Sequence, residues 1–251
     1  MTDAPTTLIV HAHPEPRSFT AAWAGASADA ARAAGHSVLT SDLCAMGFDP
    51  VEHPRHYADP PGPFDPLKAQ EGQPMPDDTA GEAEKLLAAD TVILHFPIWW
   101  FGPPAILKGW LDRVLAHGHL HDVDMRFDRG RLAGKRLLIC ATTGASADEV
   151  SHAGREGDLD LLLWPVAQTF RYLGFTILRP LACHDVHGYH EGPDLDALDA
   201  RLGERLARQA DVIAGLDAHP VWPFNRDDDF DGTGRLKPGA PSHSPMIRHH
   251  S

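Results

Sequence analysis

The sequence predicts an α/β protein built on a doubly wound, parallel sheet of five strands in the order 2-1-3-4-5. Short apolar runs rich in β-branched residues alternate with longer segments of helical periodicity, which is typical of parallel sheets. Right-handed crossovers with one reversal of direction give the strand order. The expected strands cover 7–12, 36–42, 91–97, 136–142 and 175–183. The expected helices cover 18–34, 79–89, 103–116, 159–173 and 195–214.

The first strand and helix carry clear boundary signals. The run Thr7 to Val10 is a short apolar strand, and Ser18 is suited to cap the helix that follows. An apolar stripe that includes Trp23 runs along this helix, and Gly35 ends it. The second strand, 36–42, then completes a strand–helix–strand unit.

Prolines mark the boundaries in the middle of the chain. Pro97 ends the third strand because it has no N–H for the ladder. Pro103 and Pro104 open the next helix, where a missing N–H costs least. The strand 136–142 and the later elements then repeat the same alternation. The pattern shows no internal repeat and no second domain.

Two segments, 49–78 and 217–251, lack a regular pattern and are rich in Pro, Asp and Gly. A connection as long as 49–78 is more often functional or interfacial than idle. The tail cannot form a core alone, so we expect it to lie across the domain or across a neighbouring subunit. The expected organisation is therefore one domain over residues 1–216 and a long irregular C-terminal tail over 217–251.

Composition limits the classes of function. The 251 residues include 22 Lys+Arg and 35 Asp+Glu, a formal net charge of −13, which argues against general binding to nucleic acid or to anionic membranes. Cys44, Cys140 and Cys183 show no CxxC spacing and indicate buried thiols in a reducing compartment. Neither a signal peptide nor a membrane-spanning segment is indicated. We therefore expect a cytoplasmic protein without direct membrane insertion.

The loop after the first strand has the features of an anion site. A capped helix start at Ser18 follows His13 and Arg17, and backbone N–H groups with the helix dipole favour phosphate there. The alternative is an ordinary cap flanked by solvated His and Arg. No GxGxxG follows the first strand and no GxxxxGK[ST] occurs, which disfavours a classical dinucleotide-binding site and a P-loop.

The loop after the third strand is the most distinctive segment. Trp99, Trp100 and Phe101 lie at the carboxyl end of a strand, where open α/β sheets bind ligands, and a flat aromatic ligand suits them. The alternative is that the rings pack a strand-to-helix corner. The Thr142-to-Ala145 loop after the fourth strand offers hydroxyls, backbone donors and close approach at Gly144. In the predicted order all three loops face one crevice, and a flavin nucleotide fits it.

At these residues the chain resembles the flavodoxin-like NAD(P)H:quinone reductases of the DT-diaphorase type, with the related oxidoreductases of bacterial potassium-efflux systems. The resemblance covers roughly residues 6–216. It rests on Leu8-Ile9-Val10 through His13, Ser18-Phe19, Phe96-Pro97, Trp100-Phe101-Gly102, Pro104 through Trp110, Thr142-Thr143-Gly144 and Leu163-Trp164-Pro165.

The resemblance implies a cofactor, a mechanism and a set of contacts. Family members are dimers, usually hold FAD, and pass hydride from NAD(P)H to quinones by a ping-pong relay; FMN is the other flavin to consider. The residues implied at the flavin pyrophosphate are His13, Ser18, Phe19 and Thr20, with Arg17 beside them. Those implied around the ring are Pro97, Ile98, Trp99, Trp100, Phe101, Thr142, Thr143, Gly144 and Ala145.

Two departures from the family pattern concern catalysis and substrate. Where better-studied members place a Tyr and a His after the Thr-Thr-Gly loop, this chain has Val150 and Glu156. Val cannot donate a hydrogen bond to a flavin oxygen, and neither can an ionised Glu. Any relay of protons to the flavin therefore needs another group. The weak catalytic candidates are Ser151, His152 and Glu156. The substrate-facing candidates are Trp100, Phe101, His121 and Val123, the last two in place of family aromatics.

Histidine is abundant, with 17 in the chain, so a metal site has to be weighed. His117, His119 and His121 alternate, and a second group recurs around 184–190. Neither has the spacing of a recognised metal motif, and we expect no metal.

Two functions from different classes remain. The first is a flavin-dependent NAD(P)H oxidoreductase acting on quinones or similar small two-electron acceptors. The second is a flavoprotein regulator of a potassium-efflux transporter whose turnover is incidental. We expect a homodimer in either case.

Overall fold

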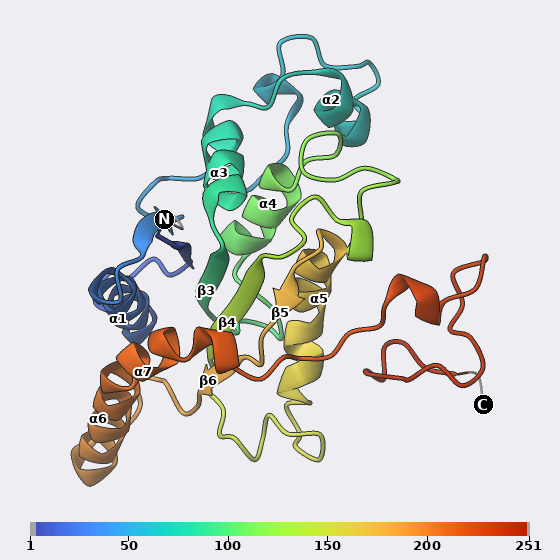
Figure 1. Ribbon diagram of the computed structural model, residues 1–251. Helices are drawn as coiled ribbons and strands as arrows, with labels where there is room; N and C mark the ends of the chain where they lie inside the picture. The colour runs from blue at the N-terminus through green and yellow to red at the C-terminus, as the bar shows by residue number, and fades with distance from the viewer. Residues whose placement is uncertain (1–3, 250–251) are drawn as a thin grey trace.

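The computed structural model describes residues 4–249 and has the predicted architecture, a parallel sheet between two layers of helices (Figure 1). The order β2-β1-β3-β4-β5 confirms the predicted 2-1-3-4-5. The strands are β1 (Thr6–His11), β2 (Ser37–Asp42), β3 (Thr91–Pro97), β4 (Arg136–Thr142), β5 (Thr176–Ile177) and β6 (Leu181–Cys183). The helices are α1 (Phe19–Ala33), α2 (Pro66–Gly72), α3 (Asp77–Ala88), α4 (Ala105–Val114), α5 (Leu159–Tyr172), α6 (Gly192–Ala207) and α7 (Gln209–Ala214).

The predicted single strand at 175–183 is wrong, because two short strands, β5 and β6, replace it and make the sheet six-stranded. Both pair in parallel with β4, β5 near its beginning and β6 near its end. Between them the N–H of Arg179 bonds to the carbonyl of Pro220 at 2.7 Å. Pro180 has no N–H to offer β4, so the ladder is interrupted there.

Two helical features also differ from the prediction. The expected helix 195–214 is divided at Arg208 into α6 and α7. The segment 49–78 contains α2, which the sequence pattern did not indicate. Asp65 caps this helix by accepting from the next backbone N–H groups, and Pro66 is its first residue. Seven residues are too few for a periodic signal, so the proline-rich context dominated the prediction.

Each helical layer buries an apolar stripe against one face of the sheet (Figure 1). Helices α1 and α7 pack on one face, where Trp23 is fully buried, and α6 packs beside α1. Helices α3, α4 and α5 pack on the other, where Trp110 and Phe170 are fully buried. Because successive strand residues point to opposite faces, Leu8 and Ile9 of β1 enter different layers.

The tail begins by packing on the domain. Trp222 is buried with the guanidinium of Arg179 5.6 Å from its ring, and Phe224 stacks on Trp164 of α5. Beyond Asn225 the chain runs out past α5, away from the sheet, as the red segment of Figure 1 shows. Across residues 4–249, no helix has the length and apolar character needed to cross a membrane.

Candidate functional site

The structure brings the three predicted loops together at the carboxyl ends of β1, β3 and β4. The imidazole of His13 lies edge-on to the indole of Trp99, with ring centroids 5.6 Å apart. The N–H of Ile98 donates to the carbonyl of Thr142 at 2.8 Å. The hydroxyls of Thr20 and Thr142 lie 3.3 Å apart. Each loop is therefore tied to another by a direct contact.

The aromatic loop is a tight two-residue turn. Trp99 and Gly102 exchange both backbone hydrogen bonds, at 2.9 and 3.2 Å. The two residues between them, Trp100 and Phe101, have φ values of 49° and 63°, the left-handed pair of a type I′ turn. Asn and Gly usually occupy such positions, and bulky residues there store strain of the kind found at functional sites.

The rings of this turn do not fill a corner of the core. Trp100 is 94% exposed, and Phe101 is 54% exposed. The corner-packing interpretation is therefore wrong for these two rings. The turn instead presents them as a surface for a ligand, and it forms one wall of a cavity of about 240 Å³.

The turn from Thr143 to Ala145 forms another wall of this cavity. The hydroxyl of Thr143 donates to the carbonyl of Ala145 at 2.8 Å, so the ring Nδ1–H of His184 must donate to that hydroxyl at 3.0 Å. Within residues 4–249 the N–H groups of Gly144 and Ala145 have no hydrogen-bond partner. The wall thus offers backbone donors rather than hydroxyls.

The segment after this turn closes the cavity with the two residues that depart from the family pattern. Val150 and Glu156 both line it. Ser151 and His152 do not line it: the Ser151 hydroxyl donates to the carbonyl of Asp148 at 2.8 Å, and His152 is exposed. Leu162 of α5 also lines the cavity, and nothing in the sequence pattern distinguished it from a core leucine.

The helix start has the predicted cap. The Ser18 hydroxyl accepts from the N–H of Ala21 at 3.2 Å, and in the described part of the chain the N–H groups of Phe19 and Thr20 remain without partners. His13 accepts at Nδ1 from the N–H of Glu15 at 3.0 Å, so its neutral ring carries the proton on Nε2.

Arg17 forms an ion pair with Glu15, a residue that the sequence pattern did not single out. Its guanidinium pairs with the Glu15 carboxylate at 2.8 Å, and both side chains are exposed. The hydrogen bonds of this pair lower the pKa of Glu15 and raise that of Arg17. Arg17 would therefore have to exchange this partner before it could hold a phosphate.

A second cavity, of about 520 Å³, lies between α2, α4 and α5. His121 lines it, with its ring edge-on to Tyr172 and to His117 at centroid distances of 5.2 Å each. Its Nε2–H donates to the carbonyl of Leu115 at 3.1 Å. Burial, followed by the neighbouring His117, lowers the pKa of His121, so the ring is neutral at pH 7.

The substrate-facing candidates are therefore not together in one chain. Trp100 and Phe101 belong to the first cavity, His121 belongs to the second, and Val123 is exposed and lines neither. The rings of His119 and His121 donate to backbone carbonyls, and no group of three metal-binding side chains occurs between residues 4 and 249.

A parallel sheet of this order, with the loops of a ligand site gathered at its carboxyl edge, defines a flavodoxin-like α/β protein. The family model described as "Flavodoxin-like fold" matches residues 5–206. The chain is 38% identical over 196 residues to NAD(P)H dehydrogenase [quinone] 1 of Rattus norvegicus, covering 74% of this chain and 70% of the relative. It is 37% identical over 186 residues to ribosyldihydronicotinamide dehydrogenase [quinone] of Pongo abelii, covering 69% and 78%.

Among solved structures, a putative quinone reductase from Klebsiella pneumoniae superimposes with a TM-score of 0.82 at 32% identity, covering 94% of this chain and 95% of that one. The chain therefore belongs to the flavodoxin-like NAD(P)H:quinone oxidoreductase family, and both curated relatives are named as quinone dehydrogenases. The general stress protein 14 of Treponema denticola, solved with FMN, shares the fold at 22% identity and a TM-score of 0.57.

Proposed function

We propose that this protein is a flavin-dependent NAD(P)H oxidoreductase that passes a hydride from NAD(P)H through bound flavin to a quinone or a similar two-electron acceptor. The observation that carries the proposal is the first cavity. It is lined by two exposed aromatic rings, Trp100 and Phe101, and by the backbone N–H groups of Gly144 and Ala145, which have no partner among the described residues. A flat ring with hydrogen-bonding oxygens and nitrogens along one edge matches both walls.

The residues around the cavity fit a flavin nucleotide along its whole length. The ring would rest between the aromatic turn and the Thr143-to-Ala145 turn. Its phosphates would reach the helix start, where Ser18 caps α1 and the N–H groups of Phe19 and Thr20 are unpaired among the described residues. FAD is the cofactor we propose, because the family resemblance implies it, and FMN is the alternative that cofactor analysis would reveal.

The protein's part in the chemistry is binding and electrostatics, while the bound flavin supplies the hydride-carrying ring. Backbone N–H groups at 144 and 145 are fixed by the turn and would stabilise negative charge on the ring edge. The exposed side of the site would admit nicotinamide and acceptor one after the other. Sequential occupancy leads to ping-pong kinetics.

We further propose a homodimer in which the two kinds of cavity meet across the interface. Trp100 and His121 lie in different cavities of one chain, and both are substrate-facing candidates. A partner would place its second cavity over the first cavity of the other chain. The flavodoxin-like domain, 1–216, would supply both cavities, and the segments 49–78 and 217–251 would contribute to the interface.

Subunit mixing tests the dimer. A chain carrying Trp100→Ala with Phe101→Ala and a chain carrying His121→Ala should each be poor catalysts. Mixed and reassembled, the two chains should recover activity at about a quarter of all sites. About half of the dimers are then mixed, and one of the two sites in each mixed dimer combines the two unaltered cavities. Sedimentation of a monomer at micromolar concentration would reject the arrangement.

The cofactor proposal is tested by the absorbance spectrum of the purified protein and by chromatography of the released cofactor. The double variant Trp100→Ala with Phe101→Ala should lose ring affinity and slow reduction by NAD(P)H while keeping its fold. Met46→Ala is the matched control, because Met46 is 45% exposed, lines neither cavity and lies outside the segments proposed for the interface. A colourless protein, or equal losses in variant and control, would contradict the proposal.

Two further variants address the phosphate end and the proton relay. Ser18→Asp should weaken flavin binding, because it puts a carboxylate against the phosphate. His152→Ala should change flavin reduction far less than the 10²–10⁴-fold expected for loss of a general acid or base, since His152 is exposed and outside the cavity. Stopped-flow reduction between pH 5.5 and 8.5 measures the latter. Slow quinone turnover combined with specific capture of a potassium-efflux transporter would favour the regulator instead.

The three cysteines, Cys44, Cys140 and Cys183, are unpaired. We infer a reducing compartment, the cytoplasm, from these thiols.

A further inference from the structure

The segment 49–78, here called the arm, is fastened at both ends by one buried arginine. Arg113 of α4 donates to the carbonyl of Asp49 at 2.7 Å and makes two bonds to the Asp78 carboxylate, at 2.7 and 3.1 Å. Its guanidinium also lies 5.2 Å from the ring centre of Phe48. The arm is therefore a closed loop held on α4 rather than an open excursion.

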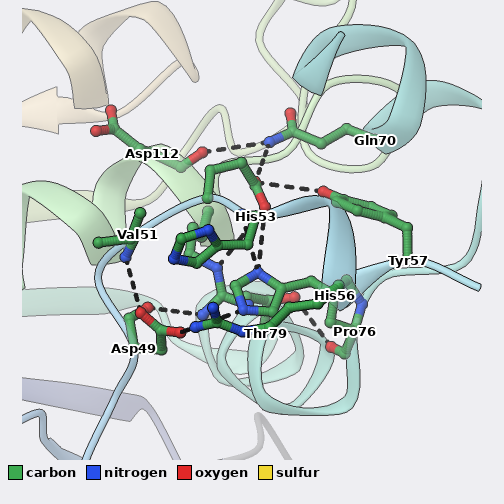
Figure 2. Close-up of polar contacts among 12 residues, drawn as sticks. Asp49, Val51, His53, His56, Tyr57, Gln70, Pro76, Thr79 and Asp112 are labelled. Carbon is green, nitrogen blue, oxygen red and sulfur yellow. Dashed lines mark hydrogen bonds and ion pairs between the residues drawn. The ribbon is translucent and has the colours of Figure 1, made fainter. Parts of the chain in front are cut away.

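Inside the arm, the Glu52 carboxylate contacts the side chains of His56, Tyr57 and Gln70, which are labelled in Figure 2. It accepts from the Tyr57 hydroxyl at 3.3 Å and from the Gln70 amide at 3.0 Å, and His56 lies 3.4 Å from it. Burial and the nearby Glu52 raise the pKa of Tyr57 to about 12, so Tyr57 stays a neutral donor. His56 also reaches Asp49, at 3.3 Å.

The Gln70 amide links this cluster to the chain segment 115–121, here called the histidine segment. Its Nε2 donates to Glu52 and, at 3.4 Å, to the carbonyl of Asp112, as Figure 2 shows. Its Oε1 accepts from the backbone N–H of His117 at 3.1 Å. Because a donor faces its oxygen and two acceptors face its nitrogen, the amide has one favourable orientation.

The backbone of the same helix end completes the attachment. The ring Nε2–H of His119 is shared between the carbonyls of Gln70 and Gln73, at 2.9 and 3.1 Å. Within the histidine segment, the N–H of Gly118 donates to the carbonyl of His121 at 2.8 Å, and the rings of His117 and His121 contact edge to face. A shift at His117 is therefore carried to His121.

We propose that Gln70 is a positioning residue that holds the histidine segment so that His117 and His121 shape the acceptor side of the site. This inference rests on the proposed function, because that function gives the second cavity its role. Gln70 borders the cavity, but its amide is fully engaged by protein partners. It therefore acts through the segment it holds rather than through the acceptor.

The discriminating variant is Gln70→Glu, which keeps the shape of the side chain and the acceptor for His117 but loses both donors. At neutral pH it places a second carboxylate about 3 Å from Glu52, and such a pair ionises fully only with difficulty. The other charged or titratable groups that face this point are His56, Tyr57, Arg113, His117 and His119. In acid the two carboxyls can share a proton, which restores a donor between them.

We expect the KM for the quinone acceptor to rise between about tenfold and a hundredfold at pH 8 in Gln70→Glu, the scale typical of an ångström-sized misplacement, and to fall back toward wild type near pH 5.5. The content and absorbance spectrum of the bound flavin should stay unchanged, because Gln70 lies outside the first cavity. The matched control is Gln73→Glu on the same helix end. The Gln73 side chain bonds only to the backbone of Asp59, so its replacement should leave the acceptor KM unchanged at both pH values.

An independent measurement separates this proposal from the proposed function. NMR titration of the imidazole rings should show the lowered pKa of His121 in the wild type moving toward its ordinary value in Gln70→Glu, because the ring leaves its buried position. If the wild type reduces no quinone but this shift occurs, the function fails and the positioning role stands. Unchanged KM together with an unchanged His121 titration overturns the positioning role, as does an equal effect of Gln73→Glu. Gln70→Leu, followed by flavin absorbance and thermal unfolding, shows whether the fold survives loss of the amide.

Discussion

The two faces of the central sheet differ in what they bury. Along β1, Leu8 and Val10 enter the apolar cluster beneath α3, α4 and α5. Their neighbours Ile9 and His11 point to the face beneath α1, where His95 of β3 is also buried. The first face is mainly apolar and includes a buried carboxylate, Glu82, that accepts from the Trp110 indole, whereas the second combines packing with a buried chain of polar side chains that includes His95. The comparison indicates that one face supplies most of the stability and the other makes stability depend on pH.

The polar chain on the α1 face has a defined direction. The indole N–H of Trp23 donates to the Gln209 oxygen at 2.9 Å, and the Gln209 nitrogen donates to the Ser27 hydroxyl at 2.8 Å. The Ser27 hydroxyl oxygen lies 2.9 Å from Nε2 of His95. The other ring nitrogen of His95, Nδ1, has no partner among the described residues, as is true of Nε2 of His11.

The largest expected effect tests the apolar face. Trp110→Ala should destabilise the protein by about 3–5 kcal/mol, because Trp110 is fully buried and its truncation leaves a cavity. It also removes the indole N–H that Glu82 accepts at 2.8 Å. Trp100→Ala, at the exposed turn, should stay within about 0.5 kcal/mol. Urea unfolding of both variants measures the difference. A loss below about 1 kcal/mol in the free energy of unfolding of Trp110→Ala would contradict the core role of Trp110.

The next effect tests the polar face through pH. Burial, with a smaller contribution from His11, lowers the pKa of His95 to about 3. Between that value and about 6.5 the unfolded chain binds a proton that the folded chain does not, so stability rises with pH and is lost as pH falls through this range. The expected slope is about 1.4 kcal/mol per pH unit. Burial also lowers the pKa of His11, in the same direction.

His95→Gln should flatten this slope, since it removes the titrating ring while keeping a hydrogen-bond partner for Ser27. His152→Gln, at an exposed position, should leave the slope as it is. Guanidinium unfolding at pH 4.5, 5.5 and 6.5 gives the slopes directly. Equal slopes in wild type and His95→Gln would assign the acid sensitivity to other groups.

A smaller effect tests the chain of donors itself. Gln209→Leu should cost about 1–3 kcal/mol, because it leaves the Trp23 indole N–H unsatisfied in a buried place. Gln168→Leu on α5 is the matched control, since Gln168 makes no hydrogen bond among the described residues, and it should cost less than about 0.5 kcal/mol. Thermal unfolding at pH 7 compares them. Similar values for the two would mean that the buried chain adds no stability.

The smallest effect compares the helix starts on the two faces. Ser18 caps α1 on the polar face, and Asp158 caps α5 on the apolar face. Ser18→Ala and Asp158→Ala should each cost about 1 kcal/mol. Only Ser18→Ala should also weaken flavin binding, because only the α1 start borders the proposed phosphate site. Calorimetry with and without flavin measures both the stability and the flavin affinity. An equal loss of flavin affinity in the two variants would show that the start of α1 does not bind the cofactor.

Much of the fold and part of the site were predictable from the sequence. The strand order and the placement of the aromatic turn after β3 are confirmed. The Ser18 cap is also as predicted. The cap and the turn depend on neighbours within a few residues, whose spacing the sequence displays. The strand order follows from the general rule of right-handed crossovers, applied to an alternation of strands and helices that the sequence shows. The split of the last strand and the helix α2 were not predictable, because they depend on Pro220 and on contacts with distant segments.

The sequence by itself determined the alternation of strands and helices, the residues at the strand ends and the cap of the first helix, because periodicity and turn chemistry act locally. Only the tertiary structure decided which of those residues meet. His121 lies in a separate cavity from Trp100, and Gln209 reaches Ser27 across 182 positions of the chain. Such pairings depend on how whole layers pack, since a hydrogen bond requires atoms about 3 Å apart and no local pattern encodes that distance.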